Sequence, residues 1–108
     1  GDFNTAHRPI DLARPNENEK TSGFLPEERE ALGRWLDAGF VDVYRWLHPD
    51  TSEYTWWTYR FNARARNIGW RLDYFLLTQD LLPTVRDAQI LGDVEGSDHC
   101  PVALELDV

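Results

Sequence analysis

The sequence predicts an α+β fold in which one substantial helix stands among several short strands. Three observations lead to this prediction. A single long helical pattern lies in the first half of the chain, short apolar runs of strand type fill the second half, and 108 residues allow at most one small domain. Hydrophobic residues make up 42% of the chain and aromatic residues 13%, which is typical of a packed globular protein rather than a disordered one.

The helix is predicted from its start and stop signals. Pro26 suits the first helical position, two glutamates follow it in the first turn, and Gly39 ends the helix. The apolar face is made by residues at helical spacing, namely Ala31, Leu32, Trp35 and Leu36. We therefore expect Trp35 to be a core residue rather than a ligand-binding one.

Shorter segments are predicted on both sides of this helix. Residues 5–25 are rich in proline, asparagine, glycine and charge, which indicates a long irregular loop. Residues 40–47 fit a short helix that ends at His48-Pro49-Asp50. Strands are predicted at 54–57, 72–77, 85–91 and 102–106, with one helical turn at 79–82.

The charges are unevenly distributed along the chain. The net charge is −8, yet residues 54–72 contain no acid and four arginines, Arg60, Arg64, Arg66 and Arg71. A basic island on an acidic body attracts a polyanion to one face. Aromatic residues lie between these arginines and favour a surface that stacks on bases and holds phosphates, although a solvated arginine-rich loop is the common alternative.

The single cysteine bears on the cellular compartment in which the chain is expected. One cysteine cannot form an intramolecular disulfide, which fits a reducing compartment, and we expect a cytoplasmic location, or a nuclear one in a eukaryote. Cys100 is interpreted as a small buried hydrophobic residue rather than a nucleophile. No apolar run is long enough for a membrane span, so no membrane partner is expected. The chain has no methionine, and Gly1 is therefore interpreted as a processed or internal end.

Three short motifs supply side chains suited to hydrolysis. They occupy residues 1–4 (GDFN), 67–74 (NIGWRLDY) and 96–102 (GSDHCPV). Together they provide an acid, amide and imidazole set: Asp2, Asn4, Asp73, Asp98 and His99. Such a set fits metal-assisted attack of water on a phosphodiester. An Asp-x-Asn pattern is also common in turns, so its interpretation depends on the other two motifs.

On these motifs the chain resembles the C-terminal half of exonuclease III-type abasic-site (AP) endonucleases, which belong to the DNase I-like superfamily of nucleases and phosphatases. The resemblance extends over residues 1–108 and depends on five stretches, 1–7, 23–29, 54–59, 67–77 and 96–102. The GDFN and SDH elements alone would fit the whole superfamily. The WWTY loop at 56–59, together with GWRLDY at 69–74, points to the abasic endonuclease branch.

The resemblance implies one half of a four-layer αββα sandwich with mostly antiparallel strands. Residues 1–108 would form the C-terminal portion of a single domain whose N-terminal half is a required partner. That half would supply further site residues, including a metal-binding glutamate, so the chain by itself is expected to be inactive. Its sheets would expose apolar faces, and self-association through those faces is a hypothesis.

The resemblance also assigns roles within the motif set. Asp2 matches the carboxylate that positions or deprotonates the attacking water, and Asn4 matches the amide that holds it. His99 matches the histidine that contacts the scissile phosphate, and Asp73 is expected to orient it by reaching a ring nitrogen. Asp98 matches an acid that binds or lies near the metal, which is expected to be Mg²⁺, with Mn²⁺ as an alternative.

DNA-contacting residues are implied in the same way. Trp56, Trp70 and Leu72 match a pocket that accepts a flipped-out, base-less sugar, although Trp70 fits the core about equally well. Arg60 lies where the family inserts a side chain into the duplex. The positions that match contacts to the DNA backbone are Arg66 and Asn18.

The resemblance implies a DNA repair nuclease that hydrolyses the phosphodiester 5′ to an abasic site in double-stranded DNA, depends on magnesium and has 3′-to-5′ exonuclease activity. Two alternatives stay open. Another branch of the superfamily, such as a retroelement endonuclease or a phosphatase, would share the catalytic set but is not expected to carry the pocket of Trp56 and Trp70. A non-catalytic fragment would bind DNA in a salt-dependent way without cleaving it.

Overall fold

Two antiparallel strand pairs form the framework of the computed structural model, which describes residues 1–108. Strand β1 (Phe40–Asp42) pairs with β2 (Leu76–Thr78), with Val41 opposite Leu77. Strand β3 (Val85–Ile90) pairs with β4 (Val102–Leu106), with Ala88 opposite Leu104. The α+β class with antiparallel strands is therefore confirmed.

Helix α1 (Pro26–Asp37) begins and ends close to the predicted residues. Pro26 occupies the first turn, and the Glu28 carboxylate accepts hydrogen bonds from the backbone amides of Gly23 and Leu25, which caps the helix. Gly39 follows the helix with a φ of 110°, a left-handed conformation that glycine adopts without a side-chain clash. These local signals explain why this element could be located from the sequence.

The remaining helical segments are short. Helix α2 (Val43–Leu47) follows β1 directly, and the Asp42 side chain caps it by accepting from the Arg45 amide. Two 3₁₀ segments cover Pro9–Asp11 and Gln79–Thr84, the second confirming the expected helical turn. No helix of the structure combines the length and apolarity that crossing a bilayer requires.

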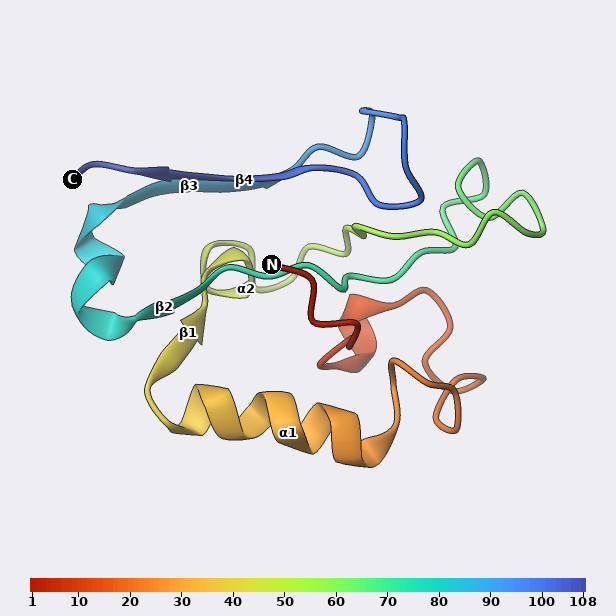
Figure 1. Ribbon diagram of the computed structural model, residues 1–108, viewed down its shortest axis with the longest axis horizontal. Coiled ribbons are helices and arrows are strands. Elements are labelled where there is room, and N and C mark those ends of the chain that lie inside the picture. Colours follow the sequence, from red (N-terminus) through yellow and green to blue (C-terminus); the bar gives the residue numbers. More distant parts are fainter.

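The elements form layers that are stacked from bottom to top in Figure 1. Helix α1 runs along one side, β3 and β4 run along the opposite side, and β1, β2 and α2 lie between them. The loop around residues 58–67 projects at the end of the molecule away from the Gln79–Thr84 segment. Residues 67–74 lead from this loop through the middle layer, whereas residues 96–102 lead into β4 in the outer layer. Apart from Val102, the motif residues lie outside the regular strands.

A buried ionic network fixes the middle layer. The guanidinium of Arg71 is fully buried and bonds to Asp11 through Nε at 2.8 Å and to Asp42 through both terminal nitrogens, at 2.9 and 2.5 Å. Arg45 reaches the same Asp11 oxygen at 2.6 Å. Each buried charge thus faces an opposite charge, as burial requires.

Several sequence-based expectations need correction. The short helix expected at 40–47 is wrong for its first three residues, which form β1 because β2 supplies a pairing partner. The expected strands at 54–57 and 72–77 are wrong in extent, because only residues 76–77 of these ranges belong to a regular strand, β2. Elsewhere they form isolated bridges, since the amides of Thr55 and Trp56 both donate to the Trp70 carbonyl and break the regular ladder.

Trp35 is not a core residue, although the helical pattern predicted one. Its side chain is 53% exposed, and its ring packs edge-on against Phe40 at 5.4 Å between centroids. Of the predicted apolar face of α1, only Leu32 is buried. The reason is that, among the regular elements, α1 packs mainly against β1, a strand of three residues that is too short to cover the whole face of a helix of twelve.

The segment predicted as irregular, residues 5–25, contributes to the core. Ala6, Leu12 and Phe24 pack with Leu72 in a small buried cluster, and Asp11 is buried in the ionic network. A second cluster contains Trp57, Ala63 and Cys100, as expected for a buried Cys100. The strands at 85–90 and 102–106 match the expectation closely.

Candidate active site

The candidate site lies where extended segments from both ends of the chain meet. Trp56 forms isolated antiparallel bridges with Trp70 and with His99, and Asp2 forms one with Asp73. Backbone hydrogen bonds reinforce this arrangement, from the Trp57 amide to the Asp98 carbonyl at 3.1 Å and between the segments 1–3 and 72–74. The three motifs are therefore adjacent in space.

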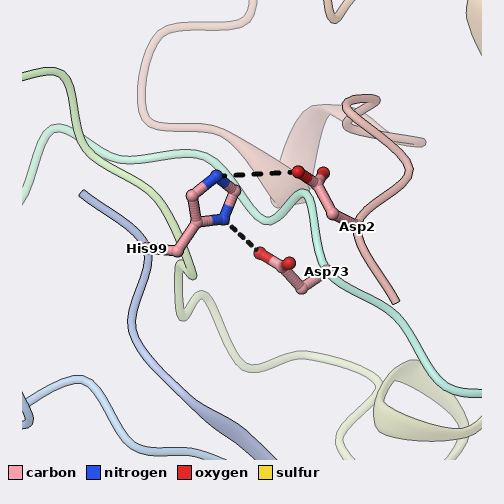
Figure 2. Close-up of side chains that lie close together, drawn as sticks. All are labelled: Asp2, Asp73 and His99. Carbon is pink, nitrogen blue, oxygen red and sulfur yellow. Dashed lines mark hydrogen bonds and ion pairs between the residues drawn. The ribbon is translucent and has the colours of Figure 1, made fainter. Parts of the chain in front are cut away.

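His99 lies between two carboxylates, as Figure 2 shows. Its Nδ1 is 2.8 Å from Oδ2 of Asp73, and its Nε2 is 3.7 Å from Oδ2 of Asp2. The predicted contact between Asp73 and a ring nitrogen of His99 is thus present. The short contact fixes the ring orientation, while the longer one leaves room for a small adjustment on the Asp2 side.

The charges around His99 favour its protonated form. Partial burial opposes protonation, but the hydrogen bond and charge of Asp73, with the charges of Asp2 and Asp98, outweigh it and raise the pKa of His99. An imidazolium is a suitable group to face a negatively charged phosphate.

Asp2 also has a local role in the turn that follows it. Its Oδ1 accepts a hydrogen bond from the Asn4 amide at 2.8 Å, and Asn4 has a left-handed φ of 51°. The turn chemistry and the approach to His99 therefore occur together, because Oδ1 serves the turn while Oδ2 faces the ring.

Asp98 lies beside His99 in the sequence but faces a different partner. Its Oδ2 accepts a hydrogen bond from the Trp56 indole at 3.0 Å. That hydrogen bond, with smaller contributions from His99 and Ser97, lowers the pKa of Asp98. The carboxylate is consequently ionised and held in one orientation by an aromatic side chain of the site.

A pocket of about 560 Å³ opens beside these groups. Its lining includes the predicted residues Asn4, Trp56, Trp70, Leu72, Asp98 and His99. The two tryptophans meet edge to face, 6.3 Å between ring centroids, and both also pack against the first core cluster. Trp70 thus lines the pocket and contacts the core at once, and its role toward a base-less sugar stays a prediction.

Gly23 also lines the pocket and lies directly beside Trp70. Its φ is 101°, and a Cβ atom at this position would lie 2.9 Å from the Trp70 ring. Such a contact is too close, and the conformation is strained for any residue with a side chain. The Trp70 ring therefore lies directly against the main chain here.

Other predicted DNA contacts lie outside the pocket. Arg60 and Arg66 are exposed on the loop of residues 58–67, which also carries the exposed rings of Tyr59 and Phe61. Asn18 is half-buried, and its side chain donates to the Arg14 carbonyl at 2.7 Å. These side chains are accessible but are not in contact with the catalytic set.

Comparison with known proteins agrees with this arrangement. Residues 1–99 match the Endonuclease/Exonuclease/phosphatase family. The chain belongs to this family. Among its relatives, "Exodeoxyribonuclease" of Bacillus subtilis (strain 168) is 51% identical and "DNA repair nuclease APEX1" of Danio rerio is 53% identical, both over 109 residues and all of this chain. The chain spans 43% and 35% of the length of these two relatives.

Solved structures of the family have the same fold. The AP endonuclease LMAP from Leishmania major overlays with a TM-score of 0.92 at 38% identity, covering 98% of this chain and 33% of that one. The 3′-5′ exonuclease NExo from Neisseria meningitidis gives 0.92 at 31% identity, covering 100% of this chain and 44% of that one. The expected DNase I-like fold is therefore confirmed.

The side chains of this endonuclease/exonuclease/phosphatase chain also fit a divalent cation. Ligand atoms of Asp2, Asp73 and His99 lie within 4.8 Å of one another. Both His99 nitrogens already face carboxylates, so a hard cation here would be held by carboxylate oxygens, the ligands that it prefers. Asp98 is not in the compact group, and its assignment as a ligand stays a prediction.

Sequence reasoning missed three contributors to this family site. Thr55, fully buried, hydrogen-bonds to the segment that carries Asp73. Glu28 lines the pocket while capping α1. Arg64 donates to three backbone carbonyls of residues 92–97 and stacks on Trp57 at 4.6 Å, so it is a structural arginine. Thr55 and Arg64 have no local signal, because their partners are distant in sequence. Glu28 carries the local signal of a helix cap, which does not indicate its second position in the pocket lining.

Proposed function

We propose that this chain carries the catalytic acids, the histidine and the lesion pocket of a DNA repair nuclease. The reaction is hydrolysis of the phosphodiester 5′ to an abasic site, with associated 3′-to-5′ exonuclease activity. The observation that carries the proposal is the position of His99, between Asp2 and Asp73 and at the edge of a tryptophan-walled pocket. The names of the relatives, a DNA repair nuclease and an exodeoxyribonuclease, support it.

In this proposal Asp2 orients and deprotonates the attacking water. Its carboxylate is 41% exposed, so water has access to it, and one oxygen is fixed by the Asn4 amide. The Asn4 side chain lines the pocket and is a suitable donor to the water or to a phosphate oxygen. Water attacks phosphorus, the P–O3′ bond breaks, and the products are a 3′-hydroxyl and a 5′-phosphate at the abasic residue.

His99 acts on the phosphate rather than on the water. Asp73 keeps the ring in place and favours its charged form, so the ring presents a positive charge toward the additional negative charge of the transition state. Asp73 is thus a positioning residue for His99 in this scheme.

Asp98 would hold the divalent cation. Mg²⁺, or Mn²⁺ in its place, would supply positive charge to the phosphate and the leaving oxygen. The Trp56 indole holds the Asp98 carboxylate ionised in one orientation, which suits a ligand for a hard cation.

The pocket provides a basis for recognising the lesion. Trp56, Trp70 and Leu72 make an apolar slot that suits a deoxyribose without a base, and the absence of a base lowers the cost of flipping the sugar out of the duplex. Arg60 and Arg66, exposed on the projecting loop, are proposed to contact the duplex and its phosphates, with Asn18 as a further contact.

Incision of a labelled duplex that carries one tetrahydrofuran abasic analogue tests the proposal. The chain is assayed alone and together with the remainder of the B. subtilis exodeoxyribonuclease that it does not match, in Mg²⁺, Mn²⁺ and EDTA. We expect incision only in the complemented sample with metal, and none for His99→Ala.

His48→Ala is the matched control, because His48 lies outside the site and contacts the Ala88 carbonyl. It should incise like the parent chain. A complemented sample that binds the duplex but never cuts it would reject the nuclease assignment and favour a non-catalytic DNA-binding role.

A further inference from the structure

Thr55 makes an unusual pair of hydrogen bonds through its side chain. It is fully buried, and its Oγ1 accepts from two consecutive backbone amides, Leu72 at 2.9 Å and Asp73 at 3.2 Å. No backbone carbonyl accepts from either amide. A hydroxyl oxygen has two lone pairs, which lets one side chain satisfy both donors.

The main chain of Thr55 contacts the segment that carries His99, the partner of Asp73. Its carbonyl accepts from the amide of Cys100 at 2.8 Å, the residue that follows His99. Its own amide donates to the Trp70 carbonyl at 2.9 Å. Thr55 is therefore bonded directly to the segment that carries Asp73 and to the segment that carries His99.

The Thr55 hydroxyl takes the place of the backbone carbonyls that would accept from the Leu72 and Asp73 amides in a regular β-ladder. On the far side of the segment, the Leu72 carbonyl accepts from Phe3, and the Tyr74 amide donates to Gly1. In a regular strand, consecutive amides point to opposite sides, so two neighbouring amides directed at one side chain mark an irregular backbone. The backbone orientation of Asp73 consequently depends on a side-chain acceptor.

We propose that Thr55 is a positioning residue that sets the distance and angle between Asp73 and His99. The inference rests on the proposed function for its catalytic consequence, but the geometry itself is independent of any reaction. The proposed role depends on the side-chain hydroxyl, because the backbone carbonyl and amide contacts of Thr55 would remain with any residue other than proline at this position.

Substitution by valine or serine tests the hydroxyl. Thr55→Val keeps the shape and loses the hydroxyl, whereas Thr55→Ser keeps the hydroxyl. The readout is the strongly deshielded proton NMR signal of the histidine N–H shared with Asp73, assigned by its absence in His99→Gln. We expect this signal in the parent chain and in Thr55→Ser, and its loss in Thr55→Val.

The same substitutions in the complemented nuclease separate positioning from substrate binding. We expect kcat of Thr55→Val to fall about 10- to 100-fold with KM little changed, since outer partners of site residues usually have effects of this size. Thr55→Ser should recover most of the activity. An intact shared-proton signal and normal kcat in Thr55→Val would overturn the inference.

Two further outcomes are informative. If Thr55→Val does not fold, hydrogen exchange of the Leu72 and Asp73 amides in the parent chain tests the inference. Fast exchange of both amides would show that the Thr55 hydroxyl does not hold them and would overturn the inference. If the signal responds as expected while no complemented sample incises DNA, the proposed function fails and the positioning role of Thr55 stands.

Discussion

His99 and Cys100 are neighbours in the sequence with opposite chemical environments. Two carboxylates face the imidazole, whereas the Cys100 thiol is buried and donates weakly to the Tyr54 carbonyl at 3.6 Å. Burial raises the pKa of the Cys100 thiol, which disfavours the reactive thiolate. The chemistry of this segment is therefore assigned to the imidazole, and Cys100 fills space in a core cluster.

The stability of the chain should depend on the charge of His99. Its pKa is raised, so the folded state binds the proton more tightly than the unfolded state does. The resulting stabilisation is complete below the ordinary pKa of about 6.5 and is lost as the pH rises through the higher folded value. Urea unfolding across this window should show a loss of a few tenths to about 1 kcal/mol, because the ring is partly exposed.

Two histidine variants control this measurement. His99→Gln should remove the pH dependence in that window, whereas His48→Gln should retain it. A pH profile unchanged in His99→Gln would assign the dependence to another group.

At the scale of elements, the buried network joins parts that are distant in sequence. Arg71 connects Asp11, which ends the first 3₁₀ segment, with Asp42, which links β1 to α2. Burial opposes the ionisation of Asp11, but Arg71 and Arg45 outweigh it and lower the pKa of Asp11. Since Arg71 directly precedes Leu72 and Asp73, this network also anchors the catalytic segment.

Replacing Arg71 with methionine should strongly destabilise the chain. The change leaves Asp11 and Asp42 near one another without their shared cation, which for a buried pair costs about 3–5 kcal/mol. Arg86→Met is the matched control, because the Arg86–Asp107 pair is exposed and should contribute under about 1 kcal/mol. Urea unfolding of both variants at neutral pH measures the difference, and equal effects would contradict the role assigned to burial.

An element could be predicted from the sequence when the residues that stabilise it lie close together along the chain. Helix α1 was predictable because Pro26, the following glutamates and Gly39 act within the segment itself. β1 was not, since its three residues become a strand only through β2, more than thirty positions away. The Asp73–His99 contact followed from a family resemblance, whereas the burial of Asp11 had no local sign in a loop rich in proline and charge.

At the scale of the whole molecule, the charge is distributed so that one region can meet a polyanion. The chain carries −8 overall, while the projecting loop presents Arg60 and Arg66 without nearby acids in the sequence. Arg64, in the same loop, is engaged by backbone carbonyls instead. The arginine island of the sequence therefore separates into exposed and structural members.

Salt-dependent binding to an uncut duplex should reveal this division. Arg60→Ala and Arg66→Ala are each expected to reduce the slope of log K against log salt concentration by about 1, because each removes one positive charge that is proposed to meet the duplex. Arg64→Ala is the comparison within the same loop and should leave the slope unchanged. Equal slopes for all three variants and the parent chain would place the DNA contact elsewhere on the surface.

The close approach of Trp70 to Gly23 limits how this pocket can diverge among descendants of this sequence. On that side the wall is main chain, and any substitution would both strain the backbone and collide with the indole ring. Side chains of increasing size therefore cannot be accommodated step by step at position 23. New substrate preferences have to arise through Trp56, Leu72 and the polar rim, so related pockets should share one constant wall and differ across from it.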